Sequence, residues 1–114
     1  MRVVFFGSGA FGIPTLEHLA GKHELAAVIS QPDRPAGRGG KATPTPVAEW
    51  TLRRGGPAPL LRPERIRSCV EEVRAIPADA WVVIAYGQKL PAALLGGKFA
   101  VNLHASLLPR WRGA

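Results

Sequence analysis

Apolar residues in this chain gather in short continuous runs, and between the runs they recur at helical spacing. A short continuous run is typical of a strand that is buried on both faces of a parallel sheet. Strands are predicted at residues 2–6, 24–30, 58–61, 79–85 and 98–104, and helices at 11–20, 46–54, from 63 onward and at 91–95. Because the two types alternate, we expect an α/β fold: a doubly wound, mostly parallel five-stranded sheet with helices on both faces.

Proline, glycine and capping residues set the expected helix boundaries. Gly21 is expected to end the first helix, and Thr45 to cap the second. Pro63 is expected to begin the third, in which Ile66, Cys69, Val70 and Val73 share one face. Residues 31–46 have no periodicity and are predicted to form a long loop, which in a compact domain is often functional.

The formal net charge is +7, and most of it lies between residues 34 and 67. Eight basic residues stand there against Glu49 and Glu64: Arg34, Arg38, Lys41, Arg53, Arg54, Arg62, Arg65 and Arg67. This excess indicates either a phosphate-rich partner such as nucleic acid or simply a solvated basic face. A single cysteine fits a reducing cytoplasm, and no apolar run reaches the ~20 residues of a membrane helix.

A glycine pattern follows the first predicted strand. Gly7, Gly9 and Gly12 match the dinucleotide-binding fingerprint, and Asp33 lies about 20 residues further on, where an acidic residue could hold a ribose. A dinucleotide-binding module is therefore one alternative. Against it, Asp33 lies past the expected end of its strand, and any tight turn into a helix favours glycine.

Asn102 and His104 lie at the end of the last predicted strand. Strand side chains alternate between faces, so these two point the same way. In an open α/β sheet, ligands bind where the strands end. An amide donor beside an imidazole suits a reaction that develops an oxyanion. The alternative is a strand end whose Asn and His merely satisfy local backbone groups.

Three segments carry a family resemblance: 31–39 (QPDRPAGRG), 85–87 (AYG) and 102–114 (NLHASLLPRWRGA). Together they resemble the methionyl-tRNA formyltransferases. The last segment is shared across folate-dependent formyltransferases, and the first points to the enzymes that act on initiator tRNA. The resemblance implies a Rossmann-like domain that transfers a formyl group from 10-formyltetrahydrofolate, without a metal, to the α-amino group of methionyl-initiator tRNA.

The resemblance also implies roles for individual residues. Asn102 and His104 match two members of a catalytic Asn-His-Asp set. The residues expected to contact the folate are Tyr86, Gly87, Ser106, Leu107, Leu108 and Pro109. The residues expected to contact tRNA are Arg34, Arg38 and Lys41.

The chain departs from the family in one respect. The catalytic Asp and a C-terminal tRNA-binding domain belong beyond residue 114, so residues 1–114 are expected to be the N-terminal portion of the catalytic domain and inactive alone. The full-length parent is expected to be a cytoplasmic monomer with no membrane partner, and the fragment to self-associate through an uncovered sheet edge. A formyltransferase acting on a nucleotide sugar or small amine remains an alternative.

Overall fold

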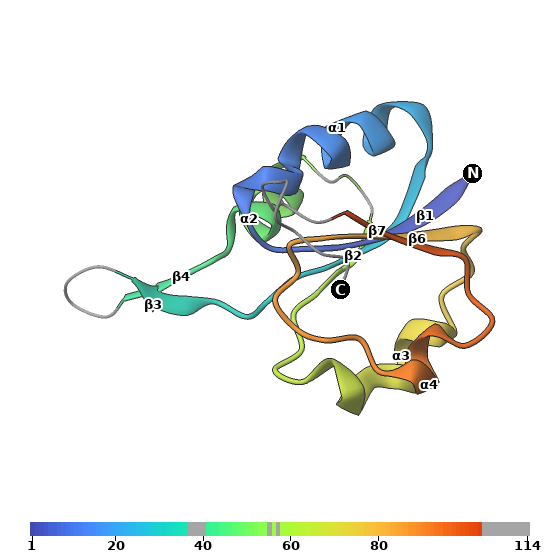
Figure 1. The fold of residues 1–114 in the computed structure, drawn as a ribbon. Helices are drawn as coiled ribbons and strands as arrows, with labels where there is room; N and C mark the ends of the chain where they lie inside the picture. The colour runs from blue at the N-terminus through green and yellow to red at the C-terminus, as the bar shows by residue number, and fades with distance from the viewer. Residues whose placement is uncertain (37–40, 55, 57, 104–114) are drawn as a thin grey trace, which may run out of the picture.

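A five-stranded parallel sheet forms the centre of the chain (Figure 1). The computed structural model describes residues 1–36, 41–54, 56 and 58–103. The strand order is β5-β2-β1-β6-β7, with β1 (Arg2–Gly7), β2 (Glu24–Ile29), β5 (Leu60–Leu61), β6 (Ala80–Ile84) and β7 (Ala100–Leu103). The expected α/β fold is confirmed, because all four strand pairs are parallel.

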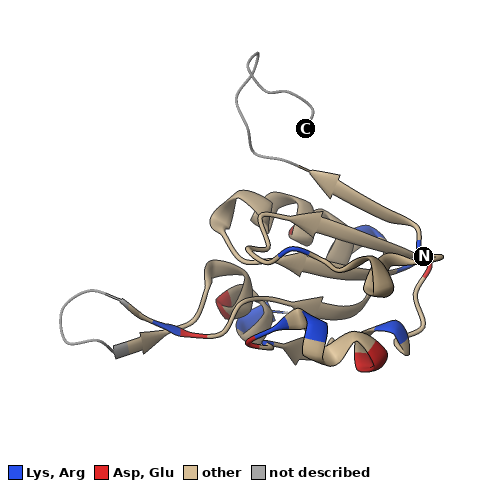
Figure 2. Cartoon of the chain, turned by 60° about the horizontal axis from the view of Figure 1, so that its bottom comes forward, with Lys and Arg blue, Asp and Glu red and all other residues tan. Residues whose placement is uncertain are grey.

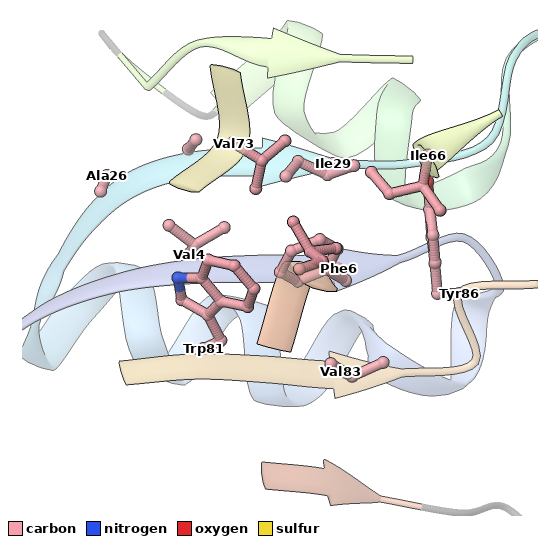
Figure 3. Close-up of a cluster of buried hydrophobic side chains, with 11 residues drawn as sticks. Val4, Phe6, Ala26, Ile29, Ile66, Val73, Trp81, Val83 and Tyr86 are labelled. Carbon is pink, nitrogen blue, oxygen red and sulfur yellow. The ribbon is translucent and has the colours of Figure 1, made fainter. Parts of the chain in front are cut away.

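Helices cover both faces of the sheet (Figure 1). A short helix η1 (Ala10–Gly12) leads into α1 (Ile13–Lys22), which lies with α2 (Pro46–Arg54) on one face. The other face carries η2 (Ile66–Cys69), α3 (Val70–Arg74) and α4 (Ala92–Leu95). Figure 3 shows Val4, Phe6 and Trp81 in the cluster on the α3 and α4 side, whereas Phe5 belongs to the cluster on the α1 and α2 side. The continuous apolar run of β1 is thus explained by burial on both faces.

The helix boundaries differ from the predicted ones in two places. Helix α1 continues through Gly21 to Lys22, and the His23 N–H donates to the Leu19 carbonyl at 2.8 Å. A single helical glycine costs about 1 kcal/mol relative to alanine, which tertiary packing offsets here. The third helical segment begins at Ile66 rather than near Pro63, because Arg65 is extended. The cap at Thr45 is confirmed: its Oγ1 accepts from the Ala48 N–H at 3.0 Å.

Residues 31–46 are not the unstructured loop that was predicted. They contain an antiparallel hairpin of β3 (Arg34–Ala36) and β4 (Lys41–Thr43), which extends away from the sheet (Figure 1). Pro35 pairs with Ala42 in this two-stranded hairpin. Proline lacks an N–H, and a hairpin with open edges tolerates it where a central strand would not. The hydrophobic pattern did not predict the hairpin because its strands are short and polar.

Strand β7 forms one edge of the sheet as described, and Figure 2 shows it free of charged residues. Phe99, Val101 and Leu103 are 67%, 40% and 45% exposed. Because alternate residues of a strand share a face, these three form an exposed apolar face beside the sheet edge, and self-association through that edge stays a prediction. Among the described helices, none is long and apolar enough to cross a membrane.

Candidate functional site

Ser8 joins the carboxyl ends of three parallel strands. Its N–H donates to the Ala85 carbonyl at 3.0 Å, and its hydroxyl donates to the Tyr86 carbonyl at 2.7 Å. The same hydroxyl accepts from the Gln31 N–H at 3.1 Å. Because β1, β2 and β6 end at this edge, Ser8 holds the turns that follow them close together. This is the edge at which open α/β sheets bind ligands.

Two of the three glycines beside Ser8 are explained by packing. A Cβ at Gly7 would lie 2.5 Å from the Phe5 ring, and one at Gly12 would lie 3.1 Å from it. Asp33, the residue considered for a ribose, accepts a hydrogen bond from Arg62 Nη1 at 2.8 Å. These contacts give Gly7, Gly12 and Asp33 structural roles that need no dinucleotide, whereas a Cβ at Gly9 would meet nothing within 4 Å.

The turn after β6 has an unusual backbone. Ala85 has φ +52° and Gly87 has φ +104°, both in the region that favours glycine. A Cβ at Gly87 would lie 2.6 Å from Gln31 Nε2, so this position has neither the backbone freedom nor the space for a side chain. Strained backbone of this kind clusters at functional sites.

A pocket of about 410 Å³ opens between this turn and β7. Asn102 lines it from β7, where it pairs with Val83 of β6. The other lining residues are Val83, Ala85, Tyr86, Gly87, Gln88, Lys89 and Leu103. The structure therefore brings Asn102, Tyr86 and Gly87 together at one pocket, and the roles expected for them stay a prediction.

Several predicted site residues lie outside the described part of the chain. They are Arg38, His104, Ser106, Leu107, Leu108 and Pro109. Arg34 and Lys41 are placed on the hairpin, where Arg34 pairs with Thr43 and Lys41 with Ala36 across the two strands. The candidate tRNA contacts and the candidate donor pocket thus lie on separate parts of the fold.

A second pocket, of about 470 Å³, adjoins the first and shares Gln88 and Lys89 with it. Its remaining lining residues are Arg65, Ile66, Arg67 and Pro91. The floor is apolar and three cations surround it. In the sequence, Arg65 and Arg67 stand out only as part of the basic region, and no local pattern marks Gln88 or Lys89 as site residues.

The basic region between residues 34 and 67 does not form one continuous surface. Arg53 and Arg54 lie on α2, where they pair with Glu49 and Glu17 at 2.9 and 3.3 Å. Arg65 and Arg67 lie instead at η2, on the opposite face of the sheet. The basic residues of this region therefore do not form a single phosphate-binding stripe, because they lie on both faces of the sheet.

The Tyr86 side chain is buried in the core. It is 2% exposed, and its ring meets Phe6 edge-on with 5.7 Å between centroids. Within the described part of the chain, its hydroxyl has no hydrogen-bond partner. Burial, with a smaller contribution from the nearby Cys69 thiol, raises the pKa of Tyr86 to about 12. The Tyr86 ring therefore belongs to the core. The folate contact predicted at this position would be made by the exposed turn around Tyr86 and not by its ring.

The buried hydroxyl gives a pH-dependence prediction. Between pH 10 and about 12 the unfolded chain loses the Tyr86 proton while the folded chain keeps it, so stability is full below pH 10 and falls as pH rises through this window. Tyr86→Phe should lack that part of the fall, and at pH 7 it should be as stable as wild type or about 1 kcal/mol more stable. Urea unfolding of both proteins from pH 7 to 12 measures the difference. A clear loss of stability in Tyr86→Phe at pH 7 would contradict an unpartnered hydroxyl.

In the described ranges, no group of three His, Cys, Asp or Glu side chains is placed to hold a metal ion. What the pocket offers is an amide side chain, strained backbone and cations. These groups can orient a ligand and stabilise negative charge.

Comparison with known proteins identifies the family. The family described as "Formyl transferase" matches residues 1–114. Methionyl-tRNA formyltransferase of Xanthomonas axonopodis pv. citri (strain 306) is 48% identical over 118 residues, covering 100% of this chain and 38% of that protein. The proteins of that name from Trichlorobacter lovleyi and Hydrogenobaculum sp. are 48% and 45% identical, and the chain covers 37% and 38% of their lengths. The chain thus spans well under half of these relatives, and it belongs to the formyl transferase family.

Proposed function

We propose that this chain is the N-terminal portion of the catalytic domain of a methionyl-tRNA formyltransferase. The enzyme would move a formyl group from 10-formyltetrahydrofolate to the α-amino group of methionyl-initiator tRNA in translation initiation. The observation that carries the proposal is the pocket at the carboxyl edge of the sheet, in which Asn102 faces the strained turn after β6. Relatives of that name, 45–48% identical over the whole chain, support it.

The proposed reaction begins when the amine nitrogen of the methionyl group attacks the formyl carbon. A new C–N bond forms, and the formyl oxygen becomes negatively charged in a tetrahedral intermediate. The Asn102 amide donates a hydrogen bond to that oxygen. The bond from the formyl carbon to folate N10 then breaks, and His104 carries the proton released by the amine to N10. The family resemblance implies an Asp as the third member of this set, and its carboxylate would orient the imidazole.

The two adjoining pockets suit a folate donor. Folate has a polar pterin ring, a flat apolar p-aminobenzoyl ring and an anionic glutamate end, and the last two match an apolar surface beside cations. The second pocket has the matching chemistry, because Ile66 and Pro91 are apolar while Arg65, Arg67 and Lys89 are cationic. Ser106, Leu107, Leu108 and Pro109 complete the proposed donor site.

The hairpin is the proposed tRNA contact. Arg34 and Lys41 stand on its two strands, and Arg38 lies between them in the sequence. An arm that extends from the body with basic residues can reach an acceptor stem, whose phosphates such side chains bind. A small acceptor would not need this arm, so the hairpin favours tRNA over a nucleotide sugar or small amine.

Replacing Arg38 by alanine in the full-length gene product tests the tRNA contact. The KM for methionyl-tRNA should rise about tenfold, and the salt dependence of tRNA binding should become shallower, because one phosphate contact is lost. The KM for the formyl donor should not change. Arg53→Ala is the matched control, since Arg53 pairs with Glu49 on α2 and has no assigned contact. An Arg38→Ala protein with wild-type tRNA affinity would show that the hairpin assignment is wrong.

The proposed function itself is tested by assaying the full-length gene product. With 10-formyltetrahydrofolate as donor, it should formylate methionyl-initiator tRNA and leave nucleotide sugars and small amines unchanged. Formylation of a nucleotide sugar instead would favour the alternative within the same family. Tight binding of a nicotinamide cofactor without formyl transfer would refute both.

A further inference from the structure

Two glutamine side chains are hydrogen-bonded to each other at the turn after β6, whose residues line both pockets. Gln88 Nε2 donates to Gln31 Oε1 at 2.7 Å and to the Pro63 carbonyl at 3.2 Å. Gln88 Oε1 accepts from the Ile66 N–H at 2.7 Å. One side chain thus joins the turns after β2, β5 and β6 to the start of η2. The hydrogen bonds of the Gln88 amide thus go to backbone groups and to the Gln31 side chain.

Gln31 is held as firmly as its partner. It is 9% exposed, its backbone N–H donates to Ser8 Oγ, and its amide lies where a Cβ of Gly87 would be. The side chain therefore supports the turn by a hydrogen bond to Gln88 and by direct contact with Gly87. Support is needed, because Ala85 holds a left-handed backbone conformation that a non-glycine residue rarely adopts.

We propose that Gln31 and Gln88 act together as a positioning pair for the formyl-donor site, an inference that rests on the proposed function. Neither is assigned a part in the chemistry. Gln88 and Lys89 line both pockets, so a shift of this turn changes the walls of both. By fixing the turn before the donor arrives, the pair removes an ordering cost that binding would otherwise carry. Loss of the pair should weaken donor use without altering tRNA use.

The test compares Gln31→Met, Gln88→Met and the double variant in the full-length gene product. Methionine keeps the side-chain length and removes the amide. Each single variant should raise the KM for 10-formyltetrahydrofolate about tenfold, as expected when a buried hydrogen bond is lost. The KM for methionyl-tRNA should stay at the wild-type value. The double variant should resemble Gln88→Met, because that substitution already removes the shared bond together with the bonds to Pro63 and Ile66.

Thr51→Val is the matched control for stability. Its buried hydroxyl donates to the Val47 carbonyl at 2.8 Å within α2, away from the pockets. This variant should lower Tm as the glutamine variants do while leaving the KM for the donor unchanged. Hydrogen exchange of the unliganded proteins gives a readout that does not depend on activity: amides of residues 85–89 should exchange faster in the glutamine variants only.

The outcomes separate the two proposals. If wild type transfers no formyl group, the proposed function and the donor-site role both fail. If wild type is active and the glutamine variants keep its donor KM and its exchange rates, the positioning role alone is refuted. Effects on donor KM that multiply in the double variant would show two independent residues, which also contradicts a pair.

Discussion

Replacing Asn102 by alanine should lower kcat for formyl transfer by about 10²–10³-fold, the usual result of removing one oxyanion donor. The amide is proposed to bind the oxygen only once it becomes charged, so the KM values for both substrates should change little. The side chain is exposed on β7 and lines the pocket, so the variant should keep the wild-type Tm. Steady-state kinetics and thermal unfolding of the full-length gene product measure both.

Asn102→Asp sharpens this test. Aspartate has the size of asparagine but lacks the amide donor and places negative charge beside the developing oxyanion. It should therefore be at least as inactive as Asn102→Ala. If instead either variant kept kcat within about twofold of wild type, Asn102 would have no part in transition-state stabilisation. Asn102 would then only satisfy local backbone groups at the strand end, which is the alternative that the spacing of Asn102 and His104 left open.

The strands could be predicted because their signal is local. In β1 from Val3 to Phe6 and in β6, the side chains pack toward one helix layer or the other, so both segments appear as unbroken apolar runs. Helix beginnings were harder to predict because distant groups set them. The N–H of Ile66 bonds to the Gln88 side chain, 22 positions away, and this tertiary contact decides where η2 begins.

The candidate site was only partly predictable for the same reason. Asn102 and Gly87 stand in recognisable segments, and the structure places both at one pocket. Gln31 begins the resemblance segment 31–39, but neither Gln31 nor Gln88 was predicted as a site residue, since a glutamine in a loop is ordinarily solvated. Only the fold shows that they bond to each other at 2.7 Å. The hairpin escaped prediction because its pairing depends on backbone groups that the hydrophobic pattern does not report.

The glycine turn after β1 gives the second large expected effect. Gly7→Ala would place a Cβ 2.5 Å from the fully buried Phe5 ring and 2.9 Å from the Ile84 carbonyl oxygen. The ring is enclosed by core and the carbonyl belongs to the neighbouring strand, so neither can move without shifting the sheet. We expect a loss of about 3 kcal/mol or more in the free energy of unfolding, at the upper end for an overpacked core. Urea unfolding at pH 7 measures it.

Gly9→Ala is the control that separates packing from ligand approach. A Cβ there meets nothing within 4 Å, and Gly9 has φ −79°, which alanine adopts freely. Its stability should stay within about 0.5 kcal/mol of wild type. If both variants were equally stable, the glycines would not serve the core, and a ligand that approaches the backbone closely would again explain them. A large loss at Gly7 alone means that this glycine is required because Phe5 packs against it, so Gly7 gives the dinucleotide alternative no support.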